Sequence, residues 1–393
     1  MSDIKYIFLV LVIAILGPFA SDSYLPSLPQ MTEYFQTTET VMQLTVTVFF
    51  LGLASFQLLW GPFSDKLGRR KALLLGGLTA LVGCVVAMFA WSPTMLNIGR
   101  FIQGAGGAAN ATLCRSVLRD RFSGPRLAQA GGIVGIFFAL VPSVAPIVGG
   151  FIQEAFDWRA NFIFLFFFTL TIVWIIWQFF PESNTNLNHR ALHWDQFMGN
   201  YKTLLTDKSF LGYTLASSAG FSGLIAYYTI SPFLLQNVLL LTPSEYGYSA
   251  IVITLGFMAG HLTNAMLVKK LGMNRMLELG FFTMLVGGVL MTTYALMGIV
   301  TLTAILAPTL IFIYGSSFTF SNGAAGAIQR FGHIAGSAGA MFGFLQILGT
   351  TIISFLISFS SDETGLTLGI TFTLMALFAF GLYNVLVTKA QEF

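Results

Sequence analysis

The chain has 393 residues, of which 55% are hydrophobic and only 9% are charged. Soluble domains usually carry about a quarter charged residues, so this composition excludes a water-soluble fold. The net charge is only +3, and no nucleic-acid partner is expected. Cys84 and Cys114 lie in apolar stretches, where a thiol normally packs as a small hydrophobe. No spacing of ligands indicates a metal site.

The apolar residues form blocks of roughly 20 residues, the length that a helix needs to cross about 30 Å of hydrocarbon. Strands of a membrane barrel would instead be alternating segments of about ten residues. In chain order, the blocks predict helices over residues 4–24, 41–61, 71–91, 94–117, 127–152, 159–180, 209–236, 245–268, 275–297, 301–325, 336–359 and 365–388. The predicted fold class is therefore all-α and integral to the membrane, with twelve helices in two pseudo-symmetric six-helix bundles.

The longest polar interval divides these helices six and six. We expect residues 1–180 to form an N-terminal bundle, 181–208 a cytoplasmic linker and 209–393 a C-terminal bundle. The linker is too short for a catalytic domain. His189 and His193 lie four apart in it, and without further ligands a solvated pair is favoured over a zinc site. The first predicted helix is too long and contains an acidic residue, which argues against a cleaved signal peptide.

The distribution of basic residues predicts an orientation. All but two of the 19 Lys and Arg residues fall on one side of the predicted helices. The exceptions are Arg159, in an opposite loop, and Arg100, within a helix. By the positive-inside rule, both termini and the linker are expected in the cytoplasm.

Two features of the first half recur weakly in the second. After the second predicted helix the chain reads Asp65-Lys-Leu-Gly-Arg-Arg-Lys, and after the eighth it reads Val268-Lys-Lys-Leu-Gly-Met-Asn-Arg. Gly104-Ala-Gly-Gly-Ala-Ala in the fourth helix is similar to Gly323-Ala-Ala-Gly-Ala in the tenth, where small residues let helices approach closely. Internal repeats of this kind are typical of transporters.

Five motifs follow one another along the chain. They are Asp22-Ser-Tyr24-Leu-Pro26-Ser-Leu-Pro29, Gly61-Pro-Phe-Ser-Asp65-Lys-Leu-Gly68-Arg69-Arg70-Lys71, Arg100-Phe-Ile-Gln103-Gly104, the stretch containing Gly135, Pro142, Pro146, Gly149 and Gly150, and Ser231-Pro232 with Glu245-Tyr246-Gly247. Through them the whole chain resembles the major facilitator superfamily, and within it the Bcr/CflA type of drug/proton antiporters, which includes chloramphenicol and bicyclomycin exporters.

The resemblance implies a proton-coupled antiporter that exports small, largely apolar drug-like molecules across a bacterial inner membrane by alternating access. It implies protons as the coupling ion, membrane lipids as partners, no other cofactor and a monomer. Some members carry an additional acidic residue about two turns before Asp22. This chain has Ile13-Ala14-Ile15 there, so coupling would depend on Asp22.

Asp22 and Arg100 are the candidate proton-coupling residues. Placing an ionisable side chain within a membrane helix costs free energy, so such a residue is a functional candidate by default. The first helix runs outward and the fourth inward, so the two residues can reach similar depth. A nearby guanidinium would hold the carboxylate ionised, and loss of water would favour its protonation. The alternatives stay open: Asp22 as a solvated helix end, and Arg100 bound to backbone carbonyls.

The motif between the second and third helices is interpreted as a gate. Gly61 and Pro62 are expected to end the second helix, Asp65 to cap the next one, and Arg69 to pair with a carboxylate such as Asp120. The resemblance implies that this cluster holds the cytoplasmic side together in the outward-facing state. The gate residues are Gly61, Asp65, Gly68, Arg69, Arg70 and Asp120.

The fifth helix is interrupted by Gly135, Pro142, Pro146, Gly149 and Gly150. Such interruptions are tolerated in a membrane where neighbours satisfy the freed backbone groups. The resemblance implies a role in antiport through close packing against the eighth helix; a packing kink without a coupling role is the alternative.

Substrate contacts are expected between the two halves, near the middle of the bilayer. Residues that offer rings, hydroxyls or amides there are Tyr24, Phe138, Tyr227, Tyr228, Tyr314, Asn322 and Gln346.

Other classes of membrane protein fit less well. No Gly-x-x-x-x-Gly-Lys-Ser/Thr sequence provides for ATP, and no nucleophile-and-base cluster indicates an enzyme. The internal repeat favours alternating access over a channel. Among carriers, a dedicated exporter of one endogenous metabolite, such as a siderophore or amino-acid derivative, is the alternative to a drug exporter.

Overall fold

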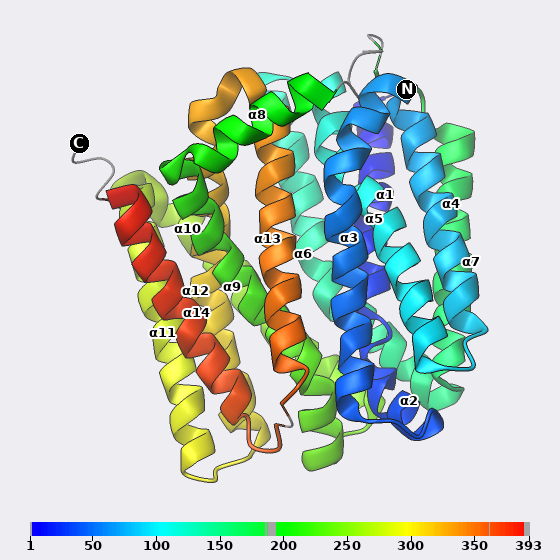
Figure 1. The fold of residues 1–393 in the computed structure, drawn as a ribbon, viewed down its shortest axis with the longest axis vertical. Helices are drawn as coiled ribbons and strands as arrows, with labels where there is room; N and C mark the ends of the chain where they lie inside the picture. The colour runs from blue at the N-terminus through cyan, green and yellow to red at the C-terminus, as the bar shows by residue number, and fades with distance from the viewer. Residues whose placement is uncertain (1, 185–186, 188–193, 361, 389–393) are drawn as a thin grey trace.

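Helices and their connecting turns make up the whole of the chain that the structure describes, which is residues 2–184, 187, 194–360 and 362–388 of a computed structural model (Figure 1). No β-strand occurs within these ranges. Twelve of the described helices run along the long axis of the molecule as two bundles of six.

The first bundle contains six long helices and two short elements near its first turn. Its helices are α1 (Asp3–Asp22), η1 (Leu25–Ser27), α2 (Leu28–Tyr34), α3 (Glu39–Leu67), α4 (Arg69–Met88), α5 (Pro93–Arg121), α6 (Gly124–Ala155) and α7 (Trp158–Phe179). α5 packs against α3, α4 and α1, and so lies at the centre of this bundle.

The second bundle begins after a helix that crosses one end of the molecule. That helix is α8 (Trp194–Thr206), inside the predicted linker, part of which lies outside the described residues. The bundle's elements are α9 (Lys208–Phe233), η2 (Leu234–Val238), α10 (Pro243–Leu271), α11 (Met273–Leu296), α12 (Leu302–Ile328), η3 (Gln329–Ile334), α13 (Ala335–Ile357), α14 (Leu366–Tyr383) and η4 (Asn384–Thr388). α9 packs against α12, α13 and α14.

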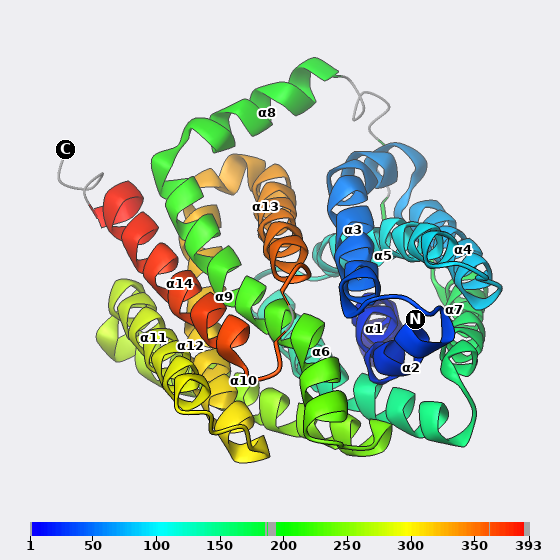
Figure 2. The ribbon, with the colours of Figure 1, turned by 60° about the horizontal axis from the view of Figure 1, so that its bottom comes forward.

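The two ends of the bundles differ in charge. We call the end that holds the α3–α4, α5–α6 and α10–α11 turns the basic end, because Lys and Arg gather there. The opposite end holds Glu33, Glu39, Glu154, Asp362 and Glu363, and we call it the acidic end. Figure 2 brings the acidic end forward.

Ten stretches of the described chain are long and apolar enough to cross a membrane. α5 and α9 are not among them. α5 carries Arg100 and four more charged residues near its end, and α9 is rich in Ser, Thr, Gly and Tyr. Both helices are shielded by the other helices of their bundle, so their polar residues avoid lipid. Helices with this composition are stable in a membrane only when surrounded in this way.

The repeated small residues sit where helices touch. A Cβ on Gly104 of α5 would lie 2.0 Å from the carbonyl oxygen of Phe49 in α3. A Cβ on Gly323, its counterpart in α12, would lie 2.7 Å from Cβ of Ser217 in α9. Only glycine permits these approaches, as the sequence comparison of the two halves predicts.

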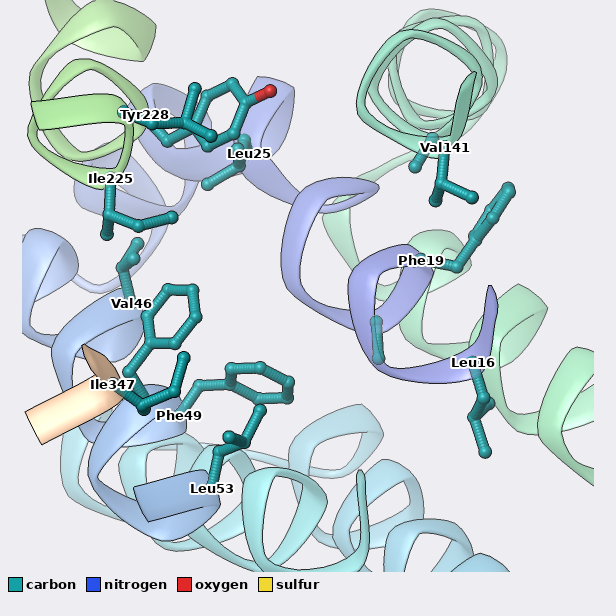
Figure 3. Packing of buried hydrophobic residues seen from close by; sticks show 14 of the residues in the cluster. Leu16, Phe19, Leu25, Val46, Phe49, Leu53, Val141, Ile225, Tyr228 and Ile347 are labelled. Atoms are coloured by element: carbon teal, nitrogen blue, oxygen red, sulfur yellow. The ribbon is translucent and has the colours of Figure 1, made fainter. Parts of the chain in front are cut away.

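The bundles join most closely toward the acidic end. α6 packs against α10, and α3 against α13. Thr47 Oγ1 lies 2.7 Å from Ser354 Oγ, and Asn237 donates to Glu39 Oε1 at 2.9 Å. Side chains of α3, α9 and α13 turn toward one another across the seam, among them Val46, Ile225 and Ile347 (Figure 3).

Candidate functional site

Arg100 of α5 is completely buried, with 0% of its surface exposed. Its Nη1 donates to the carbonyl oxygen of Ala20 in α1 and to Gln103 Oε1, each at 2.8 Å. The guanidinium carbon lies 3.9 Å from the ring centre of Tyr24 and 4.4 Å from that of Phe49. Nε and Nη2 have no hydrogen-bond partner among the described residues. The charge of Arg100 is thus stabilised by two aromatic faces, one backbone carbonyl and one side-chain amide oxygen.

Asp22 is the last residue of α1 and is 5% exposed. Its Oδ1 accepts a hydrogen bond from Ser21 Oγ. Arg100 contacts Ala20 and Tyr24, two residues before and after Asp22, yet no ion pair joins Arg100 to Asp22 within the described ranges. Burying a charged carboxylate with one hydroxyl donor costs much free energy, whereas burying the neutral acid costs little. The site can therefore take up and release a proton.

The end of α1 is fixed by its neighbours. Pro26 and Pro29 open the short elements η1 and α2, so the chain turns directly after Asp22. Gly149 of α6 lies against this turn, where a Cβ would be 1.6 Å from the carbonyl oxygen of Ser23. Asn161 of α7 donates to Ser27 Oγ at 2.8 Å and to the carbonyl oxygen of Gly149 at 3.1 Å. Helices α6 and α7 thus hold the turn that follows Asp22 in place.

Three of the predicted substrate residues gather beside this site. Tyr24 lies over Arg100 and its hydroxyl is 3.0 Å from Thr45 Oγ1. Tyr228 of α9 is 3% exposed and lies beside Leu25 of η1, three residues after Asp22 (Figure 3). The rings of Tyr227 and Tyr228 are 5.8 Å apart, and neither hydroxyl has a hydrogen-bond partner among the described residues. Both phenols are buried.

The other four predicted substrate residues have separate surroundings. Gln346 of α13 donates to Ser217 Oγ at 3.2 Å. Asn322 of α12 donates to Asn264 Oδ1 at 2.7 Å, and the Tyr314 hydroxyl donates to Thr263 Oγ1 at 3.0 Å, so both join α12 to α10. Phe138 of α6 is 42% exposed. The structure therefore does not bring Asn322 or Tyr314 together with Asp22.

The gate motif differs in two ways from the sequence expectation. α3 does not end at Gly61 and Pro62; it continues to Leu67 with Pro62 inside it and ends at Gly68, whose φ is +97°. A single proline removes one hydrogen bond, which the rest of a long helix can absorb. The cap of α4 is also not Asp65. Glu182 accepts from the backbone N–H groups of Arg69 at 2.7 Å and Arg70 at 3.2 Å.

Arg69 links three elements at the basic end. Its Nε lies 3.0 Å from Asp120 Oδ2 at the end of α5, which is the pairing expected from the sequence. Its Nη1 pairs with Asp65 of α3. Ser183 Oγ also donates to Asp120 Oδ2, at 2.9 Å. Sequence reasoning missed Glu182 and Ser183, because they follow α7 and reach this turn only through the tertiary fold.

α6 is one continuous helix despite Pro142 and Pro146. A Cβ on Gly150 would lie 2.3 Å from the carbonyl oxygen of Pro243 at the start of α10. A Cβ on Gly247 of α10 would lie 2.7 Å from the carbonyl oxygen of Pro146. Gly135, in contrast, has no neighbour within 4 Å of such a Cβ. The close packing expected with the eighth helix therefore occurs, and only in the half of α6 nearer the acidic end.

Comparison with known proteins gives a consistent result. The family profile described as Major Facilitator Superfamily matches residues 10–354. The chain is 28% identical to a "Bicyclomycin resistance protein homolog" of Haemophilus influenzae, covering 92% of this chain and 91% of that protein. It is 29% identical to a "Chloramphenicol resistance protein" of Pseudomonas aeruginosa, covering 87% and 82%. The crystal structure of a D-xylose-proton symporter superposes with a TM-score of 0.76 at 16% identity, covering 97% and 98%.

Proposed function

Because the chain belongs to the Major Facilitator Superfamily, we propose that it is a proton-coupled antiporter that exports small, largely apolar drug-like molecules from the cytoplasm. The observation that carries this proposal is that Arg100 and Asp22 are both buried without an ion pair between them, while Arg100 contacts Ala20 and Tyr24 on either side of Asp22. The resistance proteins named above, similar over most of their length, support drug-like molecules as the substrates.

The packing of α6 supports a cycle of alternating access. Gly149 and Gly150 close the acidic end against η1 and α10, while Gly135 to Phe138 at the other half of α6 are all exposed. By the positive-inside rule the basic end is cytoplasmic, which places both termini in the cytoplasm. We take this arrangement to be closed toward the outside, because α6 packs tightly only at its acidic end. We assign it to a bacterial inner membrane, as a monomer that needs only lipids and protons.

In this cycle Asp22 takes a proton from outside when the acidic end opens. Closure of that end buries the neutral acid, which is the form that burial favours. Substrate and water then reach the site from the cytoplasm, and the positive charge of Arg100 favours loss of the proton from Asp22. Arg100 keeps its own charge throughout, since a guanidinium stays protonated in proteins.

The test is proton-driven transport in proteoliposomes that contain the Asp22→Asn variant. We expect the wild type to accumulate chloramphenicol or another drug against its gradient until an uncoupler is added. Asp22→Asn should abolish accumulation driven by the pH gradient, while drug binding and the folded state remain.

Glu33→Gln is the matched control, because Glu33 is an exposed carboxylate at the acidic end. This variant should transport like the wild type. Full coupled transport by Asp22→Asn would contradict the proposed coupling site.

A further inference from the structure

The last turns of α5 carry two arginines on one exposed face. Arg115 and Arg119 are four residues apart, as are Ala111 and Arg115, and all three are exposed. Residues between them, such as Leu113 and Leu118, are buried in the first bundle. Positions four apart on a helix lie side by side, so the two guanidinium groups share one face.

This face is turned toward the second bundle. Arg119 Nη2 lies 3.8 Å from the position that a Cβ on Gly336 would take, and Gly336 is at the start of α13. Arg115 is six residues before the end of α5, which places it about 9 Å inside the helix end at 1.5 Å per residue. Arg115 therefore lies deeper than a basic loop residue whose only role is to fix the orientation of the helices in the membrane.

No carboxylate balances these two charges. Asp120 points to Arg69 and Ser183, and no ion pair of Arg115 or Arg119 exists within the described ranges. The sequence contains no Asp or Glu over residues 121–153 or 279–361, which include nearly all of α6 and all of α12, η3 and α13. Like charges one turn apart repel each other, and charges placed within a membrane helix usually serve a function.

An apolar surface lies deeper on the next helix, about 12 to 21 Å from the start of α6 at 1.5 Å per residue. Gly132 and Gly135 of α6 are exposed, and a Cβ on either would meet nothing within 4 Å. Ile136, Phe137 and Phe138 follow them and are exposed as well. Since α5 and α6 are joined by a short turn, the arginines and this apolar surface both lie in the half of the molecule that is nearer the basic end.

We propose that Arg115 and Arg119 bind the anionic group of an amphipathic substrate whose apolar body lies along α6. Guanidinium groups donate paired hydrogen bonds to a carboxylate, sulfonate or phosphate. The proposal rests on the proposed export function and adds a substrate class to it, namely amphiphiles with a single negative charge in preference to cations. Arg100 is 15 residues away along α5, roughly 22 Å, and so is a separate site.

The test compares two fluorescent probes with wild-type protein in zwitterionic nanodiscs. Anilinonaphthalene sulfonate is a monoanionic amphiphile, and phenylnaphthylamine has the same aromatic body without the charge. Replacing both arginines (R115Q with R119Q) should weaken binding of the sulfonate by about thirtyfold, because two charge-assisted hydrogen bonds are lost. Binding of the neutral amine should stay within about twofold of the wild type.

A double variant with the same change in charge, R126Q with R275Q, is the control. Both of these residues are at the basic end, and the control should bind the two probes like the wild type. Equal weakening of both probes, or no weakening of the sulfonate, would overturn the proposal.

A phospholipid headgroup is the other source of an anion. If phosphatidylglycerol in the nanodisc displaces the sulfonate from the wild type, the site belongs to lipid and the substrate assignment is wrong.

The binding assay is independent of proton coupling. We expect D22N to keep the wild-type preference for the sulfonate over the amine. Loss of transport in D22N together with an unaffected probe preference would support both proposals. Full coupled transport by D22N would contradict the coupling site alone. An unexpected result in the probe assay would contradict the anion site alone.

Discussion

The two bundles have related structures but carry their charges very differently. When Gly68 is aligned with Gly272, Asp65 and Arg69 of the first bundle correspond to Lys269 and Met273 of the second. Around Gly68, Glu182 and Asp120 complete a network of ion pairs and caps. Around Gly272 no atom lies within 4 Å of an added Cβ. The same turn therefore forms with or without the charges.

The buried site gives the same contrast. Alignment on Pro26 and Pro232 places Tyr228 opposite Asp22, and alignment on the repeated glycines places Thr319 opposite Arg100. Tyr228 and Thr319 are buried like their counterparts but are uncharged. A buried charge costs free energy in this position, and the second bundle folds without one. We therefore propose that the charges of the first bundle serve the transport cycle rather than the fold.

The largest loss of transport is expected when Arg100 of the first bundle is replaced by threonine, the residue at the corresponding position of the second bundle. Arg100→Thr removes two charge-assisted hydrogen bonds, each worth about 1.5–3 kcal/mol, and the only deep cation of the site. We expect proton-driven transport to fall by roughly a hundredfold or more. Transport in proteoliposomes, with size-exclusion chromatography to verify folding, measures this.

Thr319→Ala is the matched control for that change. It removes a hydroxyl that donates to the carbonyl oxygen of Ser316 at 2.8 Å, which should cost about 1 kcal/mol of stability and leave coupling intact. Equal losses of transport in the two variants would show that the bundles do not divide their roles in this way.

A smaller effect is expected at the gate. Arg69→Met makes the α3–α4 turn resemble the α10–α11 turn, and it removes ion pairs with Asp65 and Asp120. Arg69 is buried, so we expect a loss of about 1–3 kcal/mol in the free energy of unfolding, seen as a lower midpoint in thermal unfolding. Met273→Ala should cost less than about 1 kcal/mol, because Met273 is not part of such a network. Similar shifts in the two variants would contradict this difference.

The smallest effect concerns the two glycines. Gly68→Ala and Gly272→Ala both place a Cβ at a positive φ, of +97° and +80°, which costs about 1–2 kcal/mol. At Gly68 the new atom would also lie 2.3 Å from Glu182 Oε2 and displace the cap of α4. We therefore expect Gly68→Ala to be the more destabilising by on the order of 1 kcal/mol. Thermal unfolding of both variants measures the difference, and a larger loss at Gly272 would argue against Glu182 as the cap.

Much of the fold follows from sequence, because hydropathy and small-residue repeats act locally. The spans of most helices were accessible in this way. The Arg69–Asp120 pair was expected from the opposite charges of two loops at the same end of the bundle. The surroundings of Arg100 were not, since Phe49 and Ala20 come from two other helices and carry no signal of their own. Likewise the end of α3 at Pro62 was predicted from local preference, and packing of a long helix overrode it.

The burial of α5 and α9 has a consequence for how the protein is made. A helix that contains a buried arginine, as α5 does, or many polar residues, as α9 does, gains too little from lipid to remain in the bilayer alone. The helices that surround α5 are α1, α3 and α4, which are synthesised before it. The helices that surround α9 are α12, α13 and α14, which are synthesised after it. The partner helices of α5 are therefore already present when α5 is synthesised. The partner helices of α9 are synthesised only after α9.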